Sequence, residues 1–166
     1  EGTSRINLDT NTSLTLTNSF EIPASQTMEM IGSGTGMSVN ILDYIKLTGT
    51  LKISSENYTF SNGTLKLSGG LLNIAEDTDF NTSIEHLLSS NISVQPQKTF
   101  TYKGDVLKVA ALTLTLSGGG TIENSNNLML DNPASIVVMN GISKISGLSV
   151  NSASSSGKLS VGADSI

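Results

Sequence analysis

The chain has 166 residues, a formal net charge of −5 and no cysteine. Its nine lysines and arginines are too few and too scattered for the cationic patch of a nucleic-acid binder, so that class of protein is excluded. The absence of cysteine excludes a disulfide framework, thiol catalysis and a cysteine-based zinc site, and the length fits one domain, 1–166, with a continuous core.

Alternating apolar and polar residues predict strands in the first half of the chain. The pattern starts in residues 5–17, continues on both sides of a glycine-rich bend at 32–36, and is clearest over 45–74. Within 45–74 the bends at Gly49 and Gly69 each separate two short strands. The interval from Gly49 to Gly69 matches one turn of a β-solenoid, whose stacked turns of about 20–30 residues bury a common core.

One short helical insertion is predicted near residues 83–89. Ser83 could cap it, and residues 84–88 would form a turn and a half. His86, the only histidine of the chain, would lie on this helix beside two leucines. We therefore expect His86 to be a partly packed surface residue and not a catalyst.

The strand pattern resumes in the second half, at residues 100–102, 106–116, 128–130, 136–138, 142–150 and 159–161. Leucine and threonine alternate up to Ser117, and a glycine triplet at 118–120 follows. We expect the triplet to bend the chain and the leucines before it to face the interior. These leucines are Leu112, Leu114 and Leu116.

Two all-β architectures compete: a parallel β-solenoid (β-helix) with degenerate rungs, and an antiparallel β-sandwich or jelly roll. Asn62-Gly63, Asn140-Gly141 and residues 103–105 are hairpin signals that favour the sandwich. Asn-Gly also suits solenoid corners, because both residues tolerate positive φ. The bends at Gly118 and Gly147 follow Gly69 at longer intervals, which we read as two turns and one long turn of a solenoid.

The composition indicates the character of the core and of the surface. Aromatic residues make up 4% of the chain and Trp is absent, so we expect an aliphatic core. Charged residues make up 14%, against roughly 25% in ordinary soluble domains. The surface is therefore expected to be neutral and rich in hydroxyl groups.

The phrase Leu-Thr-Leu-Ser-Gly-Gly-Gly-Thr-Ile at residues 114–122 resembles the β-helical passenger and adhesin regions of bacterial surface proteins. These include autotransporter-like and filamentous-haemagglutinin-like segments, and the likeness covers mainly residues 45–74 and 106–162. The resemblance implies a right-handed parallel β-helix that is exported and used for attachment, display or fibre building. It carries over no catalytic residue.

A candidate metal site lies in the densest acidic cluster, residues 76–81. Asp77, Asp79 and Asn81 have the 1-3-5 spacing of an EF-type calcium loop. The pattern then departs from that loop, because Thr82 replaces its turn glycine and Leu88 its closing glutamate. The other interpretation is a polar turn that leads into the short helix, where acidic residues are favoured.

Enzymatic chemistry finds little support in the sequence. No Gly-x-Ser-x-Gly nucleophile elbow occurs, and the scattered acidic residues offer no clear facing pair for glycoside hydrolysis. We predict a protein that is not an enzyme. A carbohydrate-binding or carbohydrate-cleaving β-helix that uses Ca²⁺ is the alternative. Thr-x-Thr pairs at 15–17, 48–50 and 113–115 suggest an ice-binding solenoid as a minor alternative.

The predicted function is that of a non-catalytic, extracellular or cell-surface module for structure and adhesion. No apolar run approaches the roughly 18 residues of a membrane-spanning helix, and the start at Glu1 is expected for a processed or excised exported chain. Both ends, Arg5–Thr17 and Lys158–Ile166, have strand-like sequences. They predict end-to-end self-association or neighbouring repeats of a longer chain. The other partner expected is a glycan or cell-surface ligand.

Overall fold

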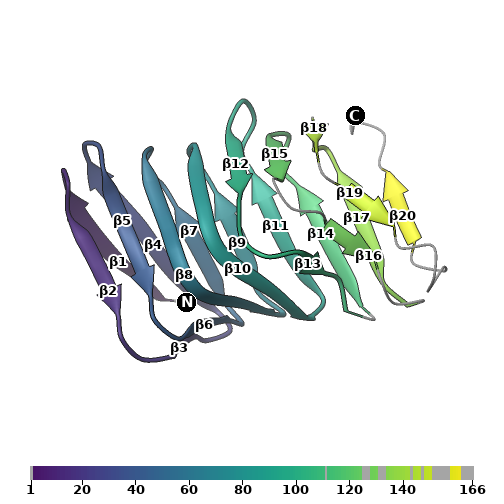
Figure 1. Ribbon diagram of the computed structural model, residues 1–166, viewed down its shortest axis with the longest axis horizontal. Helices are drawn as coiled ribbons and strands as arrows, with labels where there is room; N and C mark the ends of the chain where they lie inside the picture. The colour runs from purple at the N-terminus through teal and green to yellow at the C-terminus, as the bar shows by residue number, and fades with distance from the viewer. Residues whose placement is uncertain are drawn as a thin grey trace.

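The protein is a β-solenoid (Figure 1). The computed structural model describes residues 2–110, 112–124, 128–130, 134–142, 144–146, 148–150 and 158–161. In these residues the regular elements are strands without a helix, and every strand pairing among them is parallel. The predicted solenoid is confirmed, and the antiparallel sandwich is wrong.

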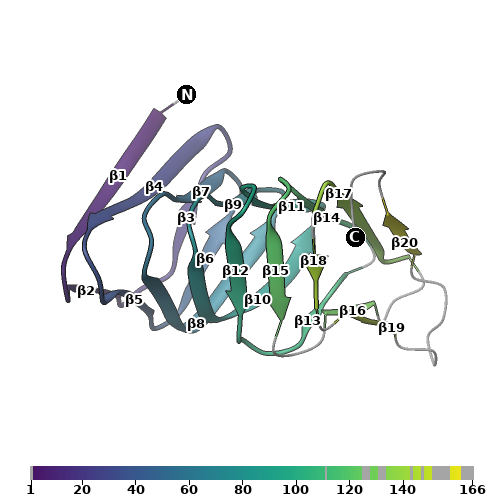
Figure 2. The ribbon, with the colours of Figure 1, turned by 90° about the horizontal axis from the view of Figure 1, so that it is seen from above.

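Each turn of the chain crosses three faces (Figure 2). The first face consists of β1 (Gly2–Asp9), β4 (Gln26–Ser33), β7 (Thr50–Ile53), β9 (Leu71–Ile74), β11 (Ser90–Val94), β14 (Thr113–Ser117), β17 (Ile136–Asn140) and β20 (Lys158–Val161). The second face consists of β2 (Ser13–Leu16), β5 (Met37–Ile41), the first halves of β8 (Tyr58–Ser68) and β10 (Thr78–Leu88), β12 (Thr99–Tyr102), β15 (Thr121–Asn124) and β18 (Lys144–Ile145). The third face consists of β3 (Phe20–Ile22), β6 (Tyr44–Leu47), the second halves of β8 and β10, β13 (Leu107–Lys108), β16 (Leu128–Leu130) and β19 (Leu148–Val150).

The length of a turn varies only slightly along the first face. The shortest turn pairs Leu71 with Asn91, and the two longest, of equal length, pair Gly2 with Gln26 and Ser90 with Leu114. Both lengths lie within the range of about 20–30 residues that is typical of solenoid turns. The prediction from the Gly49–Gly69 spacing is therefore confirmed.

The glycine bends belong to two different corners. Gly49 lies between the third and first faces and stacks against the next turn there, where its carbonyl accepts the Leu71 amide at 2.9 Å. Gly118–Gly120 lies between the first and second faces, where the Gly120 amide donates to the Val94 carbonyl at 3.0 Å. The interval from Gly69 to Gly118 therefore contains the two predicted turns and one further strand, β14, and Gly147 lies outside the described residues.

The predicted hairpin signals are corners between parallel strands. Asn62 and Gly63 have positive φ angles of 58° and 51°, and they bend β8 from the second face to the third. Gly141, with a φ of 74°, follows β17. Residues 103–105 connect β12 with β13. Positive φ thus serves corner geometry here and not a two-residue hairpin.

Aliphatic side chains form columns through the interior, one residue from each turn. One column on the first face contains Met28, Leu51, Leu72, Ile92, Leu116 and Met139. Leu114 and Leu116 are buried as predicted. Leu112 is 36% exposed, so its predicted interior position is wrong. It lies in the bend before β14, where the alternation of the strand has not yet begun.

The core also contains an aromatic stack, so the expectation of a purely aliphatic core is wrong. Tyr58, Phe60, Phe80, Phe100 and Tyr102 are all buried. Phe80 stacks on Phe60 with ring centroids 4.9 Å apart and meets Phe100 edge-on at 5.6 Å. Parallel register causes this arrangement, because it places Phe60 and Phe80 at the same height in successive turns.

The predicted helical insertion near 83–89 is wrong, because this segment is the second half of β10. Side chains alternate along it, with Ile84 and His86 buried and Glu85 exposed. The ladder with β8 pairs Ile84 with Leu65 and overrides the capping preference of Ser83. The part of the chain that the structure describes contains no helix that could cross a membrane.

Candidate functional site

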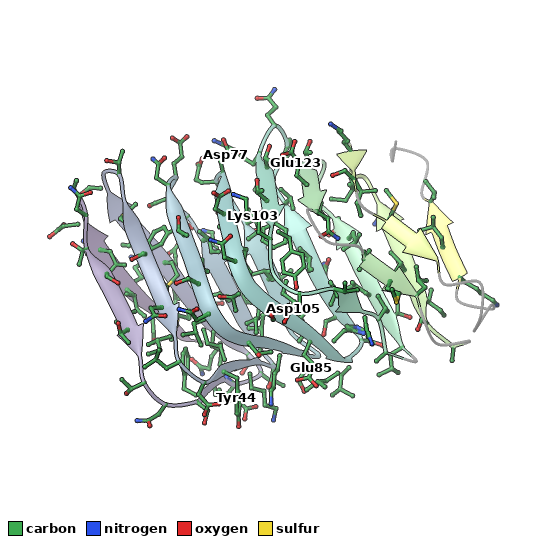
Figure 3. All side chains as sticks on the ribbon, viewed as in Figure 1. Tyr44, Asp77, Glu85, Lys103, Asp105 and Glu123 are labelled. Carbon is green, nitrogen blue, oxygen red and sulfur yellow. The ribbon has the colours of Figure 1, made fainter. Side chains whose placement is uncertain are left out.

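The predicted calcium residues lie on the outside of the second face. Asp79 and Asn81 are on β10, and Asp77 is in the corner before it. Asp77 accepts a hydrogen bond from the Thr99 amide at 2.7 Å. Asp79 forms an ion pair with Lys103, with 2.9 Å between carboxylate oxygen and ammonium nitrogen. Both carboxylates therefore bind groups of the next turn, and Figure 3 shows where Asp77 and Lys103 lie on the strands.

This geometry differs from that of an EF-type loop. Alternate residues of an extended strand are about 6.5–7 Å apart and point the same way, so Asp77, Asp79 and Asn81 form a row on the outer surface along the start of β10 and do not converge. Among the described residues, no group of three or more histidine, aspartate or glutamate side chains could hold a metal ion. A calcium site would therefore need ligands besides these three, and it stays a prediction.

A second acidic group surrounds Lys98 at the corner next to this row. The Lys98 ammonium lies 3.4 Å from a Glu56 carboxylate oxygen and also contacts the Glu76 carboxylate. Glu76, and then Glu56, raise the pKa of Lys98. Each carboxylate of this group thus has a cation beside it, which weakens the field that would attract a free cation.

An uncharged groove of about 450 Å³ lies where the third face meets the first. Gly69 and Gly70 form the corner before Leu71 and leave it without bulky side chains, whereas Leu71 itself lies between Thr50 and Asn91. Its lining residues are Ser25, Thr48, Gly49, Thr50, Gly69, Gly70, Leu71, Ser89, Ser90, Asn91, Thr113 and Thr115. Hydroxyl and amide groups without charge suit a neutral polar ligand.

The Thr-x-Thr pairs are the feature of the sequence that could have indicated this groove. Thr48–Thr50 and Thr113–Thr115 both line it, because the register brings Thr50, Leu71, Asn91 and Thr115 into one outward column. Thr15 lies on the second face, paired with Asn40. The sequence shows the pairs but not the register, so the groove itself was missed. Leu71 and Asn91 interrupt the threonine column that an ice-binding face would need.

An ion cluster also lies on the outer side of the first face, with Glu29 at its centre and the more exposed Arg5 and Lys52 beside it. Glu29, 8% exposed, binds Arg5 at 2.9 Å and Lys52 at 2.8 Å, and Ser54 donates to it at 2.8 Å. Three successive turns supply these groups. The hydrogen bonds from Lys52, Arg5 and Ser54 lower the pKa of Glu29 from 4.5 to about 2.

Replacing Glu29 with glutamine is expected to remove part of the acid sensitivity of the protein. Because the folded-state pKa is lowered, the charged carboxylate stabilises the fold fully above pH 4.5 and loses this effect as the pH falls toward about 2. Glu29→Gln should lower the free energy of unfolding at neutral pH by about 1–3 kcal/mol and flatten its decline in acid. Urea unfolding at several pH values measures both effects. Glu123→Gln, at an exposed position, is the control and should behave as the wild type.

The third face is interrupted between β10 and β13, which belong to different sheets. We call this break between the two strands the joint. β13 pairs with β16 in a separate three-stranded sheet, and side chains connect it to β10. The Tyr102 hydroxyl accepts the Ile84 amide at 3.1 Å and donates to the Asp105 carbonyl at 2.6 Å. Burial raises the pKa of Tyr102 to about 12, so this hydroxyl keeps its proton and remains a donor.

His86 lies inside the joint, and the prediction that it is a partly packed surface residue is wrong. Its side chain is 3% exposed, and its Nδ1 accepts the Ala110 amide at 3.2 Å. Ser83 faces outward from the same strand, and its hydroxyl donates to Asp105 at 2.9 Å. Because Ser83 and His86 point in opposite directions, they do not form a nucleophile–base pair.

The chain matches no known protein family, no curated protein and no solved structure. The features that bear on function are therefore the groove, the ion cluster, the joint and the last described strand, β20.

Proposed function

We propose that this protein is a non-catalytic structural and adhesive module of the cell surface or the extracellular space, which associates end to end with further β-solenoid turns. The observation that carries the proposal is the first face, where eight described strands form one uninterrupted parallel sheet. Adhesin and passenger regions, which residues 45–74 and 106–162 resemble, are expected to have this architecture.

The mechanism of such a module is mechanical. Each turn is joined to the next by backbone hydrogen bonds on its faces and by buried columns between them. A force along the solenoid axis is then shared among many parallel bonds, and within the described ranges the short corners offer little extended chain to a protease. The outer surface is rich in hydroxyl groups and its charged residues make up only 14% of the chain, which permits close contact with another surface.

The last described strand supports association at the end of the stack. Leu159 and Val161 of β20 are in register with Val137 and Met139, which are buried in β17. Their own exposed fractions are 42% and 55%. Among the described residues β20 pairs on one side only, with β17, and an edge strand with apolar side chains is a template for adding another strand. The partner proposed is a further turn from a second copy of this chain or from a longer chain.

Sedimentation velocity over a concentration series, together with negative-stain electron microscopy, tests this proposal. The wild type should form end-to-end assemblies that grow with concentration, and the double variant Leu159→Lys, Val161→Lys should not. Leu42→Lys, at a position 57% exposed away from this end, is the matched control and should assemble. Monomers at every concentration, or unchanged assembly of the double variant, would contradict self-association.

The groove on the first face favours a second candidate function, the binding of a neutral glycan. Its uncharged hydroxyl and amide groups could exchange hydrogen bonds with sugar hydroxyls. Glycan-array binding that Thr50→Val and Asn91→Leu weaken would support this candidate. Loss of binding or of sugar release on adding a chelator would indicate the calcium-dependent form.

A further inference from the structure

His86 occupies a column that is otherwise aliphatic in the neighbouring turns. The register places it level with Leu67, which pairs with Leu47, which pairs with Ile22. All three of these residues are buried. A single imidazole therefore replaces a branched aliphatic side chain, and it does so in the turn next to the joint between β10 and β13.

The hydrogen bonding of the ring identifies its neutral tautomer. Because Nδ1 accepts the Ala110 amide, the proton of the neutral ring is on Nε2. Nε2 is buried and makes no hydrogen bond of good geometry, although the Thr113 backbone near the ring favours its charged form in part. A second proton must therefore add to Nδ1, at the position toward which the Ala110 N–H points. The charged ring would then direct a proton against that N–H and lose the hydrogen bond.

The charged groups of the surrounding elements do not offset this cost. On β10 itself Glu85 points outward, and its carboxylate lies 3.9 Å from the ammonium of Lys66 on β8. Asp105, in the segment before β13, binds Ser83, and Lys108 of β13 is exposed. Tyr102 of β12 presents a neutral hydroxyl. None of the ion pairs in the described part of the chain includes His86.

We propose that His86 makes the joint between β10 and β13 acid-sensitive. Its imidazole takes a proton from water at Nδ1, releases the Ala110 amide, and opens the joint so that the imidazolium reaches solvent. The turns up to β10 and the turns from β13 onward are then held together by the first and second faces alone. The proposal does not depend on the function proposed above.

The direction of the pH dependence follows from burial. Burial lowers the pKa of His86 from 6.5, and the backbone of Thr113 opposes this shift in part. The unfolded chain then binds the proton more readily, so stability is complete above about pH 6.5 and falls as the pH drops below that value. The folding equilibrium constant should fall by up to about tenfold per pH unit. Because His86 is the only histidine, this range is well separated from that of Glu29.

Hydrogen exchange and urea unfolding between about pH 5 and pH 8 test the proposal. After correction for intrinsic rates, amides of residues 103–112 should exchange faster at the acidic end, whereas those of β7 and β9 should not. His86→Leu restores the aliphatic column, and both of its responses should be independent of pH in this range. His86→Gln keeps an uncharged acceptor and is the second variant.

Equal pH dependence in the wild type and in His86→Leu would overturn the proposal, as would uniform acceleration of exchange along the chain. If neither variant folds, titration of the wild-type imidazole by NMR decides the matter. A folded-state pKa at or above 6.5, or a titration without broadening or shift of the Ala110 amide signal, would then refute it.

Discussion

Phe80→Ala is expected to lower the free energy of unfolding by about 3–5 kcal/mol. Phe80 is completely buried, stacks on Phe60 at 4.9 Å and meets Phe100 at 5.6 Å. Removing the ring leaves a cavity between turns. Ladder hydrogen bonds fix the spacing of the backbones of these turns, so the backbones cannot move together to fill the cavity. Equilibrium urea unfolding followed by circular dichroism measures the change.

Two further variants show whether the stack is responsible for this loss. Phe80→Leu refills most of the volume and should cost less than Phe80→Ala. Leu42→Ala removes an apolar side chain that is 57% exposed and should change the free energy by no more than about 0.5 kcal/mol. Similar losses from Phe80→Ala and Leu42→Ala would show that the aromatic stack does not support the turns around it.

The sequence was sufficient to predict the solenoid because strand alternation and the corner spacing are local properties. The interval between Gly49 and Gly69 agrees with the observed length of a turn. The contact between Phe60 and Phe80 could have been predicted in the same way, since the same interval separates these two residues in the sequence. Phe100 continues that spacing but pairs with Thr78 and not with Phe80, so equal spacing alone does not establish stacking.

The errors in the prediction come from contacts between turns. Ser83 and the residues after it are compatible with a short helix, and the parallel ladder with β8 selects the strand instead. The same ladder turns His86 inward, and only then does its position beside the joint become visible. The groove also depends on register, since Thr50 and Thr115 are far apart in the sequence and share one outward column. A turn length that varies from one turn to the next conceals such columns from pattern analysis.

Gly49→Ala is expected to destabilise the protein by about 3 kcal/mol, through steric conflict between turns. A Cβ atom at this position would lie 2.1 Å from the Pro23 carbonyl oxygen and 2.4 Å from that of Gln26. Both oxygens belong to the backbone of the preceding turn, so no side-chain rotation can relieve the contact. The corner would have to widen and would weaken the hydrogen bond from Leu71 to the Gly49 carbonyl. Urea unfolding measures the loss.

Gly69→Ala shows whether the loss of stability in Gly49→Ala comes from the close approach of the turns or from backbone conformation. Gly69 has a φ of +94°, but a Cβ there would meet no atom within 4 Å. Its replacement should therefore lower the free energy of unfolding only by the strain of an alanine in the left-handed region of φ, about 1–2 kcal/mol. A larger loss for Gly69→Ala than for Gly49→Ala would mean that φ, and not the distance between turns, limits this corner. The expected order requires the turns of this solenoid to stack closely enough at the corner that one added methyl group separates them.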